Sequence, residues 1–218
     1  YQGIGQHGVV CRAEFANGES SVAVVFVDVA TPTDASTPLV DANFEADTRD
    51  THWGHYFKFY RKRLTGYEWV EREDGKGRCM RLFADAKKSN SVAGCLAPGA
   101  WDIEAYPYVR FSYRIPKGTP VGLCVEPFAA PKLPRRVLLG GTAARSKADS
   151  RVGRDTGTLA LIDDGAWHTA TVDVRAVREA IPNLGYLRVV QFHCYWPRAS
   201  TYEFRFDDFA ILPADARP

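Results

Sequence analysis

The sequence predicts an all-β protein, built as a two-sheet antiparallel β-sandwich or jelly roll. Short runs of β-branched and aromatic residues recur along the chain, and glycine, proline, aspartate and asparagine separate them. Sustained 3.6-residue periodicity is almost absent. The exception is "RAVREAIPN" (175–183), which predicts a short helix near 175–181 that ends at Pro182. Eight or more strands at this spacing are typical of a sandwich or jelly roll.

The first 38 residues are predicted to form a unit of their own. In "GVVCRAEFANGESSVAVVFVDVA" (8–30), two β-rich runs are joined through Asn17-Gly18, which predicts a β-hairpin. "TPTDASTP" (31–38) has little to bury and predicts a linker or a crossing loop. We therefore divide the chain into 1–38, a hairpin and linker that could end a preceding module, and 39–218, the main domain.

The main domain contains eight further candidate strands. They lie at 55–64, 77–85, 108–116, 119–128, 157–162, 166–174, 186–196 and 201–212. In 166–174, strict alternation separates Trp167 from His168, and we assign Trp167 to the core. The arginine-rich and glycine-containing stretch 133–157 predicts a surface loop, which could line a binding groove.

Composition excludes several classes of function. The chain has 218 residues, with 28 Lys and Arg against 26 Asp and Glu, so its net charge is +2. This near balance argues against a nucleic-acid partner, and the basic run "FKFYRKRL" (57–64) predicts a half-buried strand instead. No apolar run approaches the length that spans a bilayer, so we expect no membrane partner. Because the chain opens with Tyr1, we expect a fragment or mature form joined to other domains.

The five cysteines predict neither a metal site nor a catalytic thiol. They are irregularly spaced, and none belongs to a Cys-x-x-Cys pair. Cys194 follows His193 directly, and neighbouring side chains on a strand point to opposite faces. We expect thiols buried in the core.

Four segments of the main domain resemble the galactose-binding-like β-sandwich, the jelly roll of many carbohydrate-binding modules. The segments are "DANFEADT" (41–48), "EDGKGRCMRLF" (73–83), "DDGAWHTATVDV" (163–174) and "RFDDFAIL" (205–212). Their order implies a jelly roll from about residue 39 to 212. The resemblance further implies a non-catalytic polysaccharide-binding module of a larger bacterial enzyme, secreted or held at the cell surface. Residues 1–38 are not covered by it.

The resemblance also implies a structural calcium ion at one end of the sandwich. Carried over to this chain, Glu45 and Asp207 would be side-chain ligands, and the backbone oxygens of Lys76 and Gly77 would complete the shell. Calcium prefers such hard oxygen ligands. The alternative is that Asp207 binds backbone amides without a metal. Asp208 is expected on the opposite face of its strand, in solvent.

Sugar binding requires flat apolar faces and a few fixed polar groups. The candidates are Trp53, Trp69, Tyr195, Trp196, His193 and Arg198. Against this stands the ordinary role of tryptophan in the core of a β-sandwich. The basic stretch 133–157 would suit an acidic polysaccharide.

The main alternative is a jelly-roll polysaccharide lyase or glycoside hydrolase acting on an acidic polysaccharide. "QFH" (191–193) resembles the Gln-Ile-His motif of one alginate lyase family, so a lyase would use His193, Gln191 and Tyr195. That family's Tyr-Phe-Lys motif follows its His motif, whereas "YFK" (56–58) precedes it here. A hydrolase needs two carboxylates across the scissile bond, which adjacent strand residues on opposite faces do not supply. A third class is a structural or adhesive module without a sugar ligand.

Overall fold

The computed structural model describes residues 5–14, 20–29, 38–45, 65–84, 91–96, 100–128, 136–143, 155–195 and 203–216. Residues 5–14, 20–29, 65–66, 84, 91–96 and 193–195 are described by their backbone alone. This part of the chain is built almost entirely of strands. They are β1 (Gly5–Glu14), β2 (Ser20–Val29), β3 (Val40–Ala42), β4 (Thr65–Glu71), β5 (Arg78–Ala84), β6 (Ser91–Leu96), β7 (Trp101–Asp102), β8 (Tyr108–Arg114), β9 (Gly122–Pro127), β10 (Val137–Gly141), β11 (Asp155–Ala160), β12 (Trp167–Asp173), β13 (Tyr186–Tyr195) and β14 (Glu203–Leu212).

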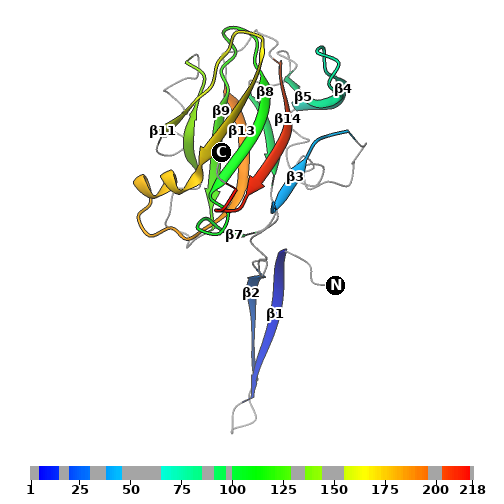
Figure 1. The fold of residues 1–218 in the computed structure, drawn as a ribbon. Helices are drawn as coiled ribbons and strands as arrows, with labels where there is room; N and C mark the ends of the chain where they lie inside the picture. The colour runs from blue at the N-terminus through cyan, green and yellow to red at the C-terminus, as the bar shows by residue number, and fades with distance from the viewer. Residues whose placement is uncertain are drawn as a thin grey trace.

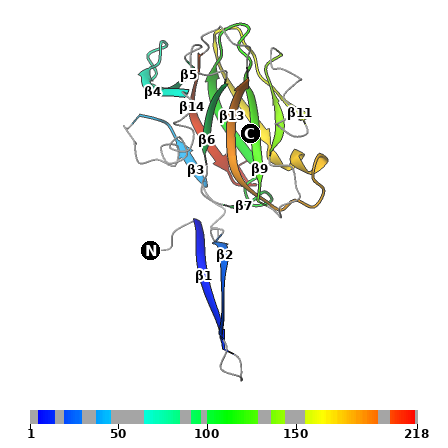
Figure 2. The same ribbon diagram turned by 180° about the vertical axis from the view of Figure 1, so that it is seen from behind.

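Two sheets pack face to face and confirm the predicted β-sandwich (Figures 1 and 2). One, here the β14 sheet, has the order β12-β8-β14-β5-β4, with β3 also paired to β14. The other, the β13 sheet, has the order β11-β10-β9-β13-β6, with β7 also paired to β13. The pairing of β10 with β11 is parallel, so the β13 sheet is mixed rather than wholly antiparallel.

The predicted N-terminal hairpin is present. β1 and β2 pair antiparallel from Gly5 opposite Val29 to Glu14 opposite Ser20, as a two-stranded sheet. The division of the chain at residue 38 stays a prediction. The expected linker up to residue 37 and the expected strand 55–64 lie outside the described residues.

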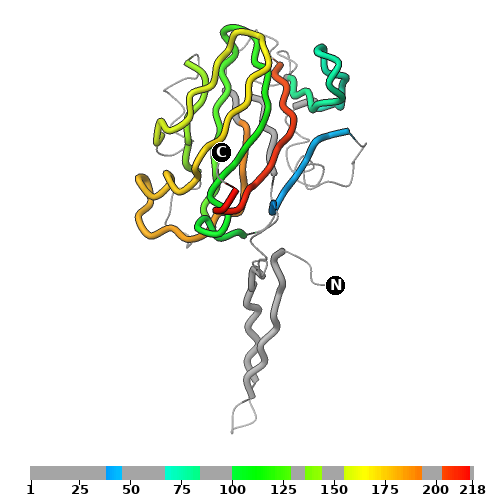
Figure 3. The backbone as a smooth tube through the Cα atoms, viewed as in Figure 1, coloured from blue at the N-terminus to red at the C-terminus, as the bar shows by residue number. Residues whose placement is uncertain are grey.

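The core between the two sheets is dominated by phenylalanine. β14 runs beside β8 along the middle of its sheet (Figure 3). The Phe192 ring lies 5.0 Å from that of Phe111 and 4.8 Å from that of Phe206, measured between centroids. Such tilted and edge-to-face pairs stabilise a core beyond the area that they bury.

Strand β12 corrects the assignment of Trp167. The alternation is as predicted, but the face that packs on the core carries Ala170 and Val172. Trp167 lies on the other face with Thr169 and is only half-buried. The small and β-branched side chains face the core, and Trp167 stands at the beginning of an edge strand.

Strand β14 contains a β-bulge at its two acids. Asp207 pairs with Ser112 and Ala210 pairs with Arg110, so three steps on β14 match two on β8. Asp208 takes a left-handed conformation, with φ of 47°. Aspartate tolerates that region better than most residues, and such an extra residue shifts the alternation of the strand. The bulge allows the core residues Phe206 and Phe209, three positions apart, to share one face.

Two other expectations are refined. The predicted helix is a 3₁₀ helix, η2 (Val174–Glu179), and the carboxylate of Asp173 accepts a hydrogen bond from Arg175 N at its start. The expected loop 133–157 contains β10 and the start of β11, so that prediction was wrong for Val137–Gly141 and for 155–157. Gly140 makes this strand possible, because a Cβ there would lie 1.9 Å from the Leu159 carbonyl oxygen.

No helix within the described ranges is long and apolar enough to cross a membrane.

Candidate functional site

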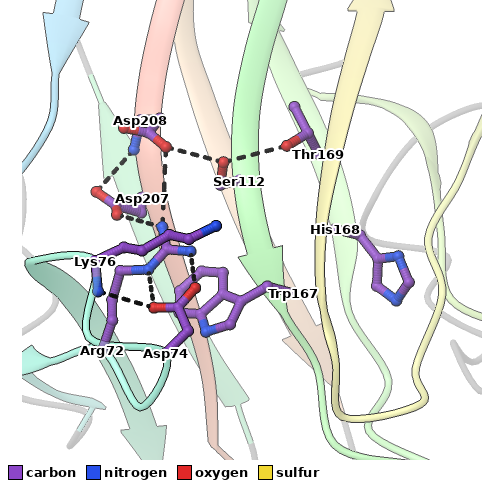
Figure 4. Close-up of a pocket in the computed structure, with 9 residues that line it drawn as sticks. All are labelled: Arg72, Asp74, Lys76, Ser112, Trp167, His168, Thr169, Asp207 and Asp208. Carbon is purple, nitrogen blue, oxygen red and sulfur yellow. Dashed lines mark hydrogen bonds and ion pairs between the residues drawn. The ribbon is translucent and has the colours of Figure 1, made fainter.

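A pocket of about 380 Å³ lies on the outer face of the β14 sheet, beneath the turn that joins β4 to β5 (Figure 4). Three segments far apart in the sequence line it. The turn contributes Arg72, Asp74 and Lys76; β8 and β12 contribute Ser112, Trp167, His168 and Thr169; and the bulge contributes Asp207 and Asp208. The sandwich therefore assembles the pocket from residues spread over 137 positions.

Arg72 is the centre of the pocket. Its Nη1 donates to Asp207 Oδ2 at 2.7 Å, and its Nε and Nη2 donate to the two oxygens of Asp74 at 3.0 and 2.8 Å. The guanidinium carbon lies 3.8 Å from the centre of the Trp167 ring. Both side chains of the Arg72–Asp207 pair are buried, with exposed fractions of 7 and 3%. Because guanidinium is planar, it can bind carboxylates at its edges and a ring on its face.

The pKa values of the two acids bound by Arg72 are shifted in opposite directions. The hydrogen bond from Arg72 lowers the pKa of Asp74 to about 2, because it favours the charged carboxylate. Burial raises the pKa of Asp207 above its ordinary value, although the hydrogen bond from Arg72 opposes this effect. The same two hydrogen bonds raise the pKa of Arg72, so its guanidinium stays charged.

Asp208 is the accessible carboxylate of the pocket. Its side chain is 53% exposed, and its Oδ2 lies 3.9 Å from Arg72 Nη1 and accepts a hydrogen bond from Ser112 Oγ at 3.0 Å. Ser112 Oγ also lies 3.3 Å from Thr169 Oγ1. The expectation that Asp208 would turn to the opposite face from Asp207 was wrong, because the bulge keeps both carboxylates near Arg72.

Two further groups complete the lining. The side chain of Lys76 extends across the pocket, and no bond from its ammonium to another described residue is seen (Figure 4). His168 Nε2 lies 2.9 Å from Asp164 Oδ1 at the edge of the site. This contact lowers the pKa of Asp164.

Ion pairs hold the β4–β5 turn on the sheet. Glu73 accepts from Arg114 Nη1 at 3.1 Å and from Arg205 Nη1. These arginines lie on β8 and β14, next to one another in register. The turn is therefore anchored over the pocket by Glu73 as well as by Arg72.

The residues expected to bind calcium do not fit that ion. Asp207 Oδ1 accepts from Asp208 N at 2.8 Å and its Oδ2 from Arg72, while Glu45 Oε1 accepts from Arg78 N at 3.1 Å. Glu45 does lie against the turn, because a Cβ on Gly77 would come within 1.9 Å of its Oε1. Among the described residues, no group of three or more His, Cys, Asp or Glu side chains is arranged to hold a metal. Calcium takes six to eight oxygens, and these carboxylates face N–H donors instead.

The predicted sugar-binding residues are not gathered in this pocket. Trp69 lies on the core-facing side of β4, where it packs edge-on against Tyr67. His193 and Tyr195 belong to β13, with backbone alone described. Trp53, Trp196 and Arg198 fall outside the described residues.

The residues considered for a lyase or a thiol are largely inaccessible where they are described. Gln191 is 1% exposed, and neither polar atom of its amide has a hydrogen-bond partner among the described residues. Burial raises the pKa of the Cys79 thiol to about 11, so it stays protonated at neutral pH. The side chain of Cys194 lies outside the described part.

Sequence reasoning missed Arg72 and misplaced Trp167. Arg72 stands between two glutamates in "VEREDGKG" (70–77) and resembles any charged turn residue. Its partner Asp207 is 135 positions away. The glycine turn before Trp167 was the one available signal, because it places the ring at a strand end.

Proteins similar to this chain are found among solved structures. No family model and no curated protein matches the sequence. Similar solved structures include a promiscuous carbohydrate-binding module of the β-sandwich superfamily, with 13% identity, 96% of this chain and 74% of that chain covered, and a TM-score of 0.37. A family 11 carbohydrate-binding module from Clostridium thermocellum has 8% identity, coverage of 69% and 83%, and a TM-score of 0.45. A tandem of family 22 modules from Paenibacillus barcinonensis has 14% identity, coverage of 90% and 55%, and a TM-score of 0.48. These solved structures are carbohydrate-binding modules with β-sandwich folds.

Proposed function

We propose that this chain is a non-catalytic carbohydrate-binding module and that it takes a sugar ring of a polysaccharide in the pocket on the β14 sheet. The observation that carries the proposal is the pocket itself. It is concave, it has the volume of a small-molecule site, and polar side chains predominate in its lining. The fixed donors and acceptors needed to select hydroxyl groups are therefore already in place.

Three side chains are available to the ligand. Asp208 offers a half-exposed carboxylate, Lys76 an ammonium, and Thr169 an exposed hydroxyl. Arg72, Asp74 and Asp207 bind one another and fix the floor of the pocket. A carboxylate and an ammonium on opposite sides of a ring can bind neighbouring hydroxyls as acceptor and donor.

The charges of the pocket favour a neutral sugar over a uronate. Three carboxylates face two cations, Arg72 and Lys76. Both oxygens of Asp74 accept from Arg72, and Asp207 accepts from Arg72 and from Asp208 N. The carboxylate that stays accessible, Asp208, would repel an acidic ring. We therefore propose that the ligand is a neutral polysaccharide and that this chain is a module of a larger secreted enzyme.

Affinity electrophoresis through gels that contain neutral or uronate-rich polysaccharides tests this proposal. We expect retardation by at least one neutral polymer, and affinity about tenfold weaker in Asp208→Asn and in Lys76→Ala, because each loses a hydrogen bond to a charged group. Arg110→Ala is the matched control, since Arg110 is exposed on the same sheet face outside the pocket.

Two results would contradict the proposal. Absence of retardation by every polymer would favour a structural or adhesive module. Retardation that both pocket variants leave unchanged would place the binding site elsewhere. Formation of unsaturated product from uronate polymers, followed by ultraviolet absorbance and lost in His193→Ala, would identify a lyase instead.

A further inference from the structure

Three segments of the protein meet at a buried cation. They are the turn between β4 and β5, strand β12 and strand β14, and the cation is a side chain of the protein itself. Arg72 comes from the turn, Trp167 from β12 and Asp207 from β14. We propose that the Arg72 guanidinium occupies the structural position that the sequence resemblance assigns to calcium, so that the sandwich is fastened by its own side chain and requires no metal there.

The contacts that the Arg72 guanidinium makes at its edges and on its face support this inference. Its Nε and Nη2 edge matches the two oxygens of Asp74 in a forked pair, and Nη1 reaches Asp207. Its face covers the Trp167 ring at 3.8 Å. A forked carboxylate pair and a stacked ring are interactions that lysine cannot reproduce.

The position also explains why Asp207 can be buried with a charge. A carboxylate with an exposed fraction of 3% needs a cation and hydrogen bonds in place of water. Arg72 supplies the cation, and Asp208 N supplies a second hydrogen bond at 2.8 Å. Arg72 Nη1 lies 2.7 Å from Asp207 Oδ2, so a calcium ion bound to the same oxygen would lie close to a fixed positive charge. The repulsion between the two cations would disfavour calcium binding.

The contact between Arg72 and Asp207 joins two segments that no backbone pairing between strands holds together. Arg72 and Asp207 are 135 positions apart, and β14 pairs directly with β5 only from Glu203 to Phe206. Beyond that point β14 bulges, and the Arg72–Asp207 bond holds the turn to the bulge. The inference concerns stability and is independent of what the pocket binds.

Thermal unfolding of the intact chain tests the inference. We expect the Tm of the wild type to stay unchanged in excess EDTA and in added calcium. Arg72→Met keeps the apolar stem and removes the charge, and it should lower the Tm by roughly 6–15 °C, because it leaves Asp207 buried without its partner. Arg110→Met, an exposed arginine on the same face, is the control and should shift the Tm by less than about 2 °C.

Chemical rescue distinguishes a guanidinium site from a general cation site. Ethylguanidinium should raise the Tm of Arg72→Ala, whereas ethylammonium and calcium should not. If Arg72→Met and Arg72→Ala do not fold, Arg72→Lys serves in their place, with a Tm below that of the wild type. The inference is overturned if EDTA lowers the wild-type Tm, if calcium restores the variants, or if Arg72→Lys is as stable as the wild type.

Discussion

The two faces of β14 show how one strand can serve two different purposes. Its inner face carries Phe204, Phe206 and Phe209, which are almost fully buried among other aromatic rings. Its outer face carries Asp207 and Asp208, which line the pocket. The inner face gains stability from burial, which depends on area and tolerates changes in direction. The outer face depends on where single charges meet, so small shifts in geometry decide its value.

The largest effect is expected on the inner face. Phe206→Ala removes a fully buried ring and should lower the free energy of unfolding by about 3–5 kcal/mol, measured by urea denaturation. The control is Phe83→Ala, because Phe83 is half-buried and stacks with Arg81 at 4.8 Å, with its Cα next to that of the core residue Leu82. Equal losses in the two variants would show that the two faces do not differ as described.

The bulge gives the next largest effect. Asp208 has a φ of 47°, a region that β-branched residues avoid, so Asp208→Val should cost about 1–2 kcal/mol. Asp208→Gly accepts this backbone conformation and should cost less, although it loses the bond from Ser112. A valine variant as stable as the glycine variant would argue against the left-handed bulge. The measurement is again denaturation in urea.

The two acids bound by Arg72 should give stability profiles of opposite slope with pH. The pKa of Asp74 is lowered to about 2 in the folded state, so its contribution to stability is present above about pH 4 and is lost as the pH falls toward 2. The pKa of Asp207 is raised, so its contribution is complete below its unfolded pKa and is lost as the pH rises through the folded value. The differences in stability between wild type and Asp74→Asn, and between wild type and Asp207→Asn, should therefore change with pH in opposite directions. Parallel profiles would contradict the assignment.

The smallest effect is expected for an exposed ion pair. Glu104 contacts Arg178 and Arg175 with its side chain 52% exposed. Glu104→Gln should change the free energy of unfolding by less than about 1 kcal/mol, and less still at high salt, because solvent screens such pairs. A loss as large as that of Asp207→Asn would remove the distinction between the buried and the exposed pairs.

Local patterns explain which parts of the fold were predictable. The alternation of β12 is visible in the sequence because its side chains face an apolar core on one side. β10 was hidden because only five residues form it, within a stretch whose arginines and glycines are typical of a loop. The apolar run "VLL" (137–139) was its only signal, and the close approach of Gly140 to Leu159 is a tertiary fact.

The site was less predictable than the fold. Asp207 was recognised as a structural acid at a strand, and the structure gives it a partner that was not foreseen, the guanidinium of Arg72. Trp167 was assigned to the core from the character of its side chain, and Arg72 covers it on the outside instead. Both contacts escaped prediction for one reason, which is that Arg72 comes from a segment that no local pattern connects to either strand.

The sequence by itself determined the all-β class, most of the strands and the short helical turn, because each depends on the residues within a single segment. It also marked "FRFDDFAIL" (204–212) as a buried strand interrupted by two acids. Only the tertiary structure decided what those acids do. The bulge turns both toward the pocket, and Arg72, brought from 135 positions away, binds the buried one. The physical reason is that the burial of a strand follows from the order of its own side chains. The contribution of a charge to stability depends instead on the charges that the fold places beside it.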